Sequence, residues 1–167
     1  TFDAQLVLEP TVLAQIAVQW PGHQPRELLR DLPAESATEE TWLALPAEAE
    51  ETEPGFQHYP VAGLPLWRDK GITVRVLIGR AFGLESPVRT ASPTTYLDLQ
   101  LEAGATLELP ALAPDLALYV ASGNPALNGE PLPTFHLALL DSGAAFSLTA
   151  STGPARLMLL GGEPLPG

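Results

Sequence analysis

Apolar and polar side chains alternate along residues 95–101, TYLDLQL. Leucine occupies positions 97, 99 and 101, and the polar residues Asp98 and Gln100 stand between them. Successive side chains of a β-strand point to opposite faces, so this period of two predicts a strand with one buried face.

Similar short segments surround this strand at near-even spacing. Glycine- and proline-containing turns such as 122–125 (SGNP) and 127–130 (LNGE) separate them, and no long amphipathic helix intervenes. Short strands in this arrangement predict a β-sandwich or jelly roll. The further predicted strands are 72–79 (ITVRVLIG), 105–109 (ATLEL), 116–121 (LALYVA), 136–140 (HLALL), 145–150 (AFSLTA) and 156–160 (RLMLL).

The N-terminal third is less regular. Its apolar residues between Leu6 and Val18 are interrupted by Pro10 and predict two short strands, or one strand and an irregular piece. Residues 26–30 predict a single helical turn. Between residues 35 and 53 every ionisable side chain is acidic, which predicts a solvated linker carrying one short strand at 42–46 (WLALP).

Composition limits the function classes. The chain has 167 residues, 46% of them hydrophobic, which predicts one folded domain with a modest extension. A net charge of −12 opposes binding to nucleic acid or to anionic membranes. No cysteine is present, and no run is long and apolar enough to span a bilayer, so we expect a cytoplasmic protein.

Three stretches resemble the pirins, a family of bicupin proteins. The first is TWLALPA at 41–47 followed by EPGFQHYP at 53–60, which is similar to the segment leading out of the N-terminal cupin. The second runs from 74 to 98, with VRV, IG, SPV and SPTTYLD, and resembles the opening of the C-terminal domain. The third is GGEPL at 161–165, which is similar to that domain's closing motif.

The resemblance implies an all-β, cupin-type jelly roll, or double-stranded β-helix, with a short N-terminal β extension. It implies two parts: residues 1–60 as a shortened remnant of the N-terminal cupin plus the acidic linker, and residues 61–167 as the C-terminal-like cupin domain. A natural short paralogue and a fragment of a longer pirin both fit this division.

Pirins bind one metal ion, usually iron, in the N-terminal cupin through a His-x-His pair and a later His and Glu. The part preceding Trp42 is too short for a full cupin. Gln19 and Trp20 resemble the dipeptide before the last ligands, but residues 21–27 lack the His-x-Glu spacing. No metal ligand is therefore carried over, and iron is expected only if the family's site were present.

The three histidines are unpaired in sequence. His23 lies in a proline-bounded loop near Glu27, and these two residues are weak candidates for metal ligands. The alternative is that His23 is an exposed loop histidine without a function. We expect His58 to make a linker hydrogen bond and His136 to be a structural histidine with its hydrogen bonds satisfied.

No catalytic or cofactor-binding residue is predicted. The segment Asp141-Ser142-Gly143 has no base beside the serine and predicts a turn, and residues 160–163 (LGGE) open no helix that would bind a phosphate. Large aromatic residues are expected to fill the interface between the N-terminal piece and the barrel. They are Trp20, Trp42, Phe56, Tyr59 and Trp67.

Two functions remain open. The first is a non-catalytic pirin-like protein that serves as a binding or assembly module and forms a homodimer to cover apolar surface. The second is part of a metal-dependent dioxygenase of the quercetin 2,3-dioxygenase type whose catalytic half is missing. A role in transcriptional regulation follows from the family resemblance alone, and no residue identifies a protein partner or substrate.

Overall fold

The computed structural model describes residues 4–8, 39–43, 46 and 59–164. The chain divides into two compact units, Thr1–Val61 and Ala62–Gly167. The described part of the first unit is an antiparallel pair, β1 (Ala4–Leu8) and β2 (Glu39–Leu43). The predicted helical turn at residues 26–30 lies outside the described residues.

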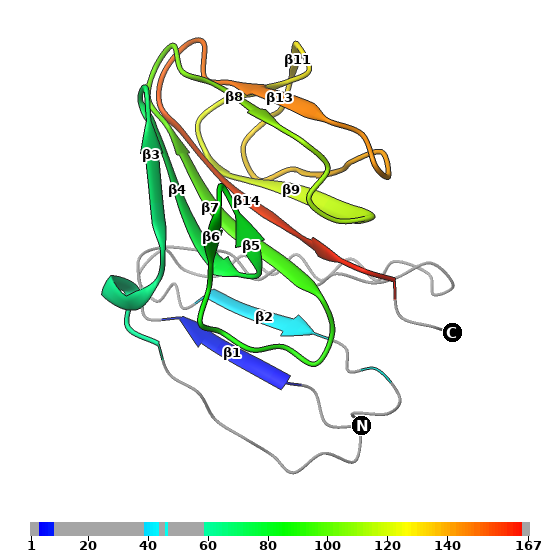
Figure 1. Ribbon diagram of the computed structural model, residues 1–167. Helices are drawn as coiled ribbons and strands as arrows, with labels where there is room; N and C mark the ends of the chain where they lie inside the picture. The colour runs from blue at the N-terminus through cyan, green and yellow to red at the C-terminus, as the bar shows by residue number, and fades with distance from the viewer. Residues whose placement is uncertain (1–3, 9–38, 44–45, 47–58, 165–167) are drawn as a thin grey trace. The chain divides into compact units, whose positions relative to one another are not determined.

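The second unit is built almost entirely of short strands (Figure 1). A 3-10 turn, η2 (Val61–Gly63), precedes them. The strands are β3 (Leu66–Asp69), β4 (Ile72–Ile78), β5 (Arg80–Ala81), β6 (Leu84–Glu85), β7 (Thr94–Leu101), β8 (Thr106–Leu109), β9 (Asp115–Ser122), β10 (Ala126–Leu127), β11 (Glu130–Pro131), β12 (Leu137–Leu139), β13 (Phe146–Thr149) and β14 (Ala155–Gly162).

Ten of these strands form two facing antiparallel sheets, and β5 and β6 pair separately as a hairpin. The larger sheet has the order β12-β9-β14-β7-β4-β3, and the smaller has the order β11-β10-β13-β8. The strand β14 is central, because it pairs with β7 on one side and with β9 on the other. The jelly-roll architecture and the strands expected beyond residue 71 are confirmed.

Two-residue turns close three of the hairpins. One of them, Asn128-Gly129 between β10 and β11, lies in the turn predicted at residues 127–130. Its φ angles are 51° and 86°, the left-handed geometry of a hairpin turn that asparagine and glycine tolerate. Phe82-Gly83 makes the corresponding turn between β5 and β6, although phenylalanine rarely adopts a positive φ. The Phe82 ring stacks on Trp67 at 4.3 Å between centroids, so Trp67 has a partner within its own unit.

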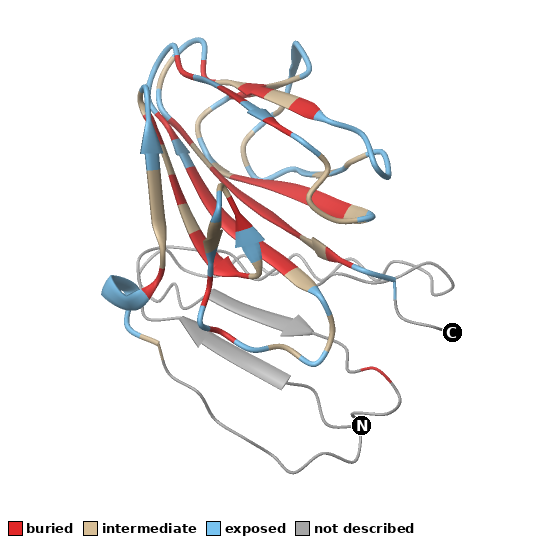
Figure 2. Ribbon diagram, in the orientation of Figure 1, coloured by how far each residue is buried: buried red, intermediate tan, exposed pale blue. Residues whose placement is uncertain are grey.

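The core lies between the two sheets (Figure 2). Leu97, Leu99 and Leu101 of β7 are at most 1% exposed, and Leu157 and Leu159 of β14 are fully buried beside them. Each such leucine contributes about 1.5–3 kcal/mol through removal from water. The alternation in residues 95–101 therefore identified the inward face of β7 correctly.

The expectation that β7 has a single buried face is wrong. Tyr96 and Asp98, on its second face, are 2% and 5% exposed, and Met158 of the neighbouring strand is fully buried on that face. A buried carboxylate needs a compensating charge, and Asp98 receives one from Arg156. The alternating pattern of leucine with polar residues gives no sign of that ion pair.

Among the described residues, no helix has the length and apolar character required to cross a bilayer.

Candidate functional site: a groove at one end of the barrel

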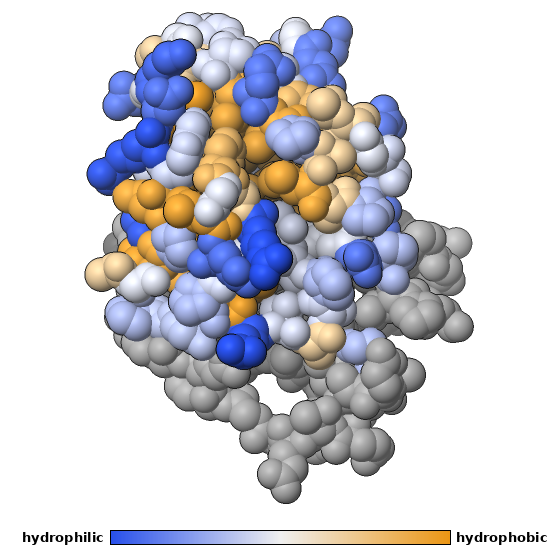
Figure 3. All heavy atoms as spheres, in the orientation of Figure 1, coloured by the Kyte–Doolittle hydropathy of each residue, from blue (hydrophilic) through white to orange (hydrophobic). Residues whose placement is uncertain are grey.

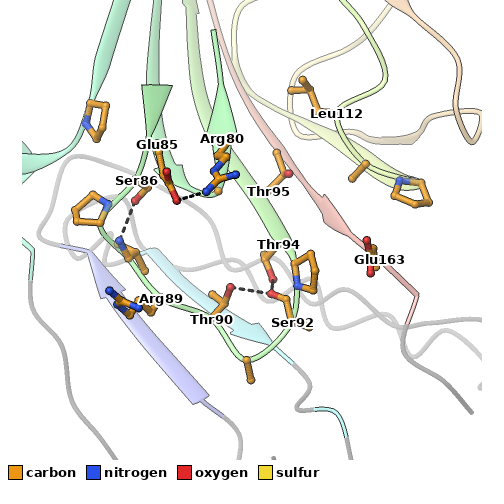
Figure 4. Close-up of a pocket in the computed structure, with 18 of the residues that line it drawn as sticks. Arg80, Glu85, Ser86, Arg89, Thr90, Ser92, Thr94, Thr95, Leu112 and Glu163 are labelled. Atoms are coloured by element: carbon orange, nitrogen blue, oxygen red, sulfur yellow. Dashed lines mark hydrogen bonds and ion pairs between the residues drawn. The ribbon is translucent and has the colours of Figure 1, made fainter. Parts of the chain in front are cut away.

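A groove of about 1160 Å³ lies at the end of the larger sheet where β4 and β14 end and β7 and β9 begin. Its walls are the β5–β6 hairpin, the segment 86–95, residues 112–114 and Glu163 (Figure 4). Hydrophilic side chains gather over the β5–β6 hairpin on the face drawn in Figure 3. The described lining residues of the groove all belong to the second unit.

At this end of the barrel the backbone of residues 93–94 lies close to Gly79 and to Gly162. A Cβ atom at Gly79 would lie 2.3 Å from the Thr94 carbonyl oxygen, and one at Gly162 would lie 2.5 Å from the Pro93 carbonyl oxygen. The amide of Glu163 donates a 3.2 Å hydrogen bond to that same Pro93 oxygen. Glycine is required here because any side chain would separate these segments, which explains the Gly161-Gly162 pair of the closing motif.

Hydroxyl groups fix the segment 86–93. The buried Ser86 hydroxyl donates to the Leu77 carbonyl at 2.6 Å and accepts from the Val88 amide at 3.2 Å. The hydroxyls of Thr90 and Thr94 both donate to the Ser92 carbonyl, at 2.8 and 3.0 Å. This loop therefore has a defined shape before any ligand arrives, which lowers the entropic cost of binding.

Charged groups give the groove its electrostatic character. Arg80 Nη2 lies 2.8 Å from Glu85 Oε1 across the hairpin. This hydrogen bond, with smaller attractions from the charges of Arg80 and Arg89, lowers the pKa of Glu85. The same hydrogen bond and the negative charge of Glu85 raise the pKa of Arg80. Both side chains are exposed, so solvent and salt weaken the pair. Among the described residues, Arg89 has no ion-pair partner within 4 Å, and it is the available cation of the groove.

The described lining of the groove suits binding better than acid–base chemistry. It contains no histidine, and its Glu85 is held in the ionised form by Arg80. A general base works best with a pKa near the operating pH, which a lowered carboxylate pKa does not provide. The groove instead offers one free guanidinium and several hydroxyls for hydrogen bonds.

The described interior of the barrel offers no set of donor atoms for a metal ion. A cupin metal site needs imidazole or carboxylate donors that converge inside the barrel. The buried cluster between the sheets consists of aliphatic side chains and Phe146, and the described residues contain no group of three His, Asp or Glu suited to an ion. Asp98, the one buried carboxylate among them, is outside this cluster and bound to Arg156.

The structure describes one of the three histidines. His136 is exposed, and its Nδ1 lies 3.1 Å from the Thr134 carbonyl oxygen that accepts its hydrogen bond. His23, Glu27 and His58 lie outside the described residues, as does any contact between them. The segment 141–143 forms a turn, closed by a hydrogen bond from the Ala144 amide to the Asp141 carbonyl.

The groove was not predicted from the sequence. Its signal is the density of Ser, Thr and Pro in residues 86–95 (SPVRTASPTT), which joins two strands and carries Arg89. Such a composition is typical of any surface loop, and the distant contributions from residues 112–114 and Glu163 depend on the strand order.

Comparison with known proteins supports the predicted family. Residues 96–167 match the family described as the pirin C-terminal cupin domain. A pirin-like protein of Caulobacter vibrioides is 38% identical over 127 residues, covering 75% of this chain and 44% of that protein. Pirin of Homo sapiens is 30% identical over 131 residues, covering 74% of this chain and 45% of pirin.

The fold has matching solved structures. The crystal structure of a quercetin 2,3-dioxygenase from Acinetobacter baumannii superposes with a TM-score of 0.68 at 29% identity, covering 75% of this chain and 42% of that chain. The present chain spans about half the length of the curated relatives it matches. On these matches and on its cupin fold, the chain belongs to the pirin family through a C-terminal pirin cupin domain.

Proposed function

We propose that this pirin-type cupin domain is a non-catalytic binding module that takes a small anionic ligand in the groove beside Arg89. The observation that carries the proposal is the aliphatic filling of the barrel, which supplies no donor atoms for an ion. The groove supplies a loop held by hydrogen bonds and the guanidinium of Arg89. The chain as a whole has a net charge of −12, so an anion would bind through this local positive charge.

The anionic character of the ligand is inferred from Arg89 alone, because the described charged side chains of the groove, Arg80, Glu85, Arg89 and Glu163, sum to zero. Arg80 is neutralised by Glu85, so Arg89 retains its charge for a carboxylate or phosphate group. Guanidinium binds such groups through two parallel hydrogen bonds. Ser92 and the buried Thr95 lie on the same wall, where their hydroxyls would orient a polar ligand.

Titration with sodium citrate and with sodium phosphate at constant ionic strength tests this role. We expect amide chemical shifts to change in residues 86–95, and we expect Arg89→Gln to abolish the changes. Arg68→Gln is the matched control, because Arg68 is an exposed arginine of β3 outside the groove. Shifts that are absent, or equal in the two variants, would exclude an Arg89 site.

The second candidate is part of a metal-dependent dioxygenase. It is favoured by the similarity to a quercetin 2,3-dioxygenase at 29% identity, of which this chain covers 42%. In that case the donors would come from residues outside the described domain, with His23 and Glu27 as the nearest candidates.

Metal analysis separates the two candidates. After loading with iron and removal of excess ion, the non-catalytic proposal predicts iron far below one equivalent and no consumption of quercetin. Stoichiometric iron that is lost in the His23→Ala and Glu27→Gln variants would instead favour the dioxygenase.

The proposal also excludes nucleic acid as the ligand. The chain carries 20 acidic and 8 basic residues, so repulsion opposes a phosphate backbone. We expect no retardation of duplex DNA or of single-stranded RNA at physiological salt.

A further inference from the structure

Exposed apolar side chains concentrate at one strand of the larger sheet. The large hydrophobic residues that the structure describes as exposed are Val61, Phe135, Leu137 and Leu139. The last three have exposed fractions of 67%, 45% and 79% and lie within five consecutive residues. We call residues 135–139 the β12 edge, because β12 ends the strand order of its sheet.

The main chain of the β12 edge is available for pairing. The Leu140 amide donates to the Leu116 carbonyl at 2.9 Å, and the Val120 amide donates to the His136 carbonyl at 3.1 Å. In an antiparallel pair such contacts alternate along the strand, so the N–H and C=O groups of Leu137 and Leu139 point away from β9. No described strand lies beyond them.

This edge lacks the usual protection against pairing. Proteins cover edge strands or place lysine, proline or an inward charge on them. Residues 131–140 (PLPTFHLALL) contain no acidic residue, lysine or arginine, although the chain has 20 acidic residues. The prolines at 131 and 133 precede β12 and leave its outward amides free.

We propose that the β12 edge pairs with the β12 edge of a second copy of this chain, as an antiparallel strand pair about a two-fold axis at Ala138. The segment Leu137-Ala138-Leu139 reads the same in both directions, so antiparallel pairing places leucine opposite leucine and alanine opposite alanine. Two copies of net charge −12 repel each other, and a segment without charged side chains is where they approach at least cost.

The pairing uses every outward group of β12. Leu137 of one copy exchanges both main-chain hydrogen bonds with Leu139 of the other, and the two-fold axis repeats the exchange. Four leucine side chains then gather on one face of a continuous sheet. Because β12 is three residues long, the buried area is small, and the dimer is weak and dependent on concentration.

A single engineered cysteine locates the axis. The two Ala138 residues form a non-hydrogen-bonded pair, with Cα atoms about 4.5 Å apart, a separation that a disulfide spans. The chain contains no cysteine. We expect Ala138→Cys to give a disulfide-linked dimer under mild oxidation, and Glu108→Cys, on the edge strand β8 of the smaller sheet, to remain monomeric.

Sedimentation of the unmodified chain supplies the second test. We expect a monomer–dimer equilibrium between about 1 and 500 µM, shifted at least tenfold toward monomer by Leu139→Lys. The control Glu108→Gln changes the net charge by the same single unit and should leave the equilibrium unchanged. A chain that stays monomeric throughout, or a dimer that Leu139→Lys leaves intact, overturns the proposal.

Discussion

Arg156 of β14 makes two hydrogen bonds with the Asp98 carboxylate of β7, from Nε to Oδ1 and from Nη2 to Oδ2, each 2.9 Å long. The strand register places Arg156 opposite Gln100, so the guanidinium reaches diagonally to Asp98. Gln100 Nε2 adds a third hydrogen bond to Oδ2 at 3.2 Å. The carboxylate is buried and the guanidinium half-buried, so the pair joins the two central strands in a water-poor environment.

Removing this carboxylate should destabilise the domain. We expect Asp98→Asn to lower the free energy of unfolding by about 2 kcal/mol, because the half-buried Arg156 loses a charged, two-point partner. Urea unfolding measures the loss. The exposed carboxylate variant Glu108→Gln should unfold like the unmodified chain, and equal stabilities of the two variants would contradict the assigned role.

At Gly161 the backbone of β14 lies close against that of β9. A Cβ atom there would lie 2.0 Å from the Asp115 carbonyl oxygen, so Gly161→Ala should cost about 1–3 kcal/mol by forcing the strands apart. Gly153 is the matched control, since its added Cβ would meet nothing within 4 Å. Thermal unfolding of both variants separates the steric cost at Gly161 from the general effect of a glycine substitution. A Gly161→Ala variant as stable as Gly153→Ala would refute the predicted steric cost.

Ser86 should hold the groove loop in place. In Ser86→Ala the Leu77 carbonyl loses its donor and the Val88 amide loses its acceptor, at a cost of about 1–2 kcal/mol. Hydrogen exchange should then accelerate in residues 86–93. The exposed turn variant Ser142→Ala provides the comparison, and unchanged exchange in Ser86→Ala would show that the loop is held by other contacts.

The pKa of Glu85 should depend on Arg80. Arg80→Gln removes the hydrogen bond that lowers it, so the pKa should rise toward the ordinary value for glutamate. A lowered carboxylate pKa stabilises the fold above the unfolded pKa, and this contribution disappears as the pH falls through the folded pKa. Carboxyl NMR titration measures the pKa of Glu85. In the unmodified chain, high salt should diminish the lowering of this pKa. Arg68→Gln should leave the titration unaltered, and a Glu85 pKa indifferent to Arg80 would count against the pair.

Local pattern predicted much of the fold. The alternation in residues 95–101 identified β7 and its inward leucines, and Asn128-Gly129 predicted a hairpin turn that the φ angles confirm. These features are local, because strand period and turn geometry are set by residues within a few positions of one another. The pirin resemblance, carried by quoted motifs, is confirmed by the family match at residues 96–167.

The amino-acid sequence by itself determined that the chain is an acidic, all-β member of the pirin family with short strands and defined turns. Only the tertiary structure decided that Asp98 is buried against Arg156, that Arg89 lines a groove with Glu163, and that Leu137 and Leu139 stand on an open edge. The physical reason is that strand order and register bring together residues far apart in the chain. An apolar residue has the same appearance in sequence whether its strand lies at the centre of a sheet or at its edge.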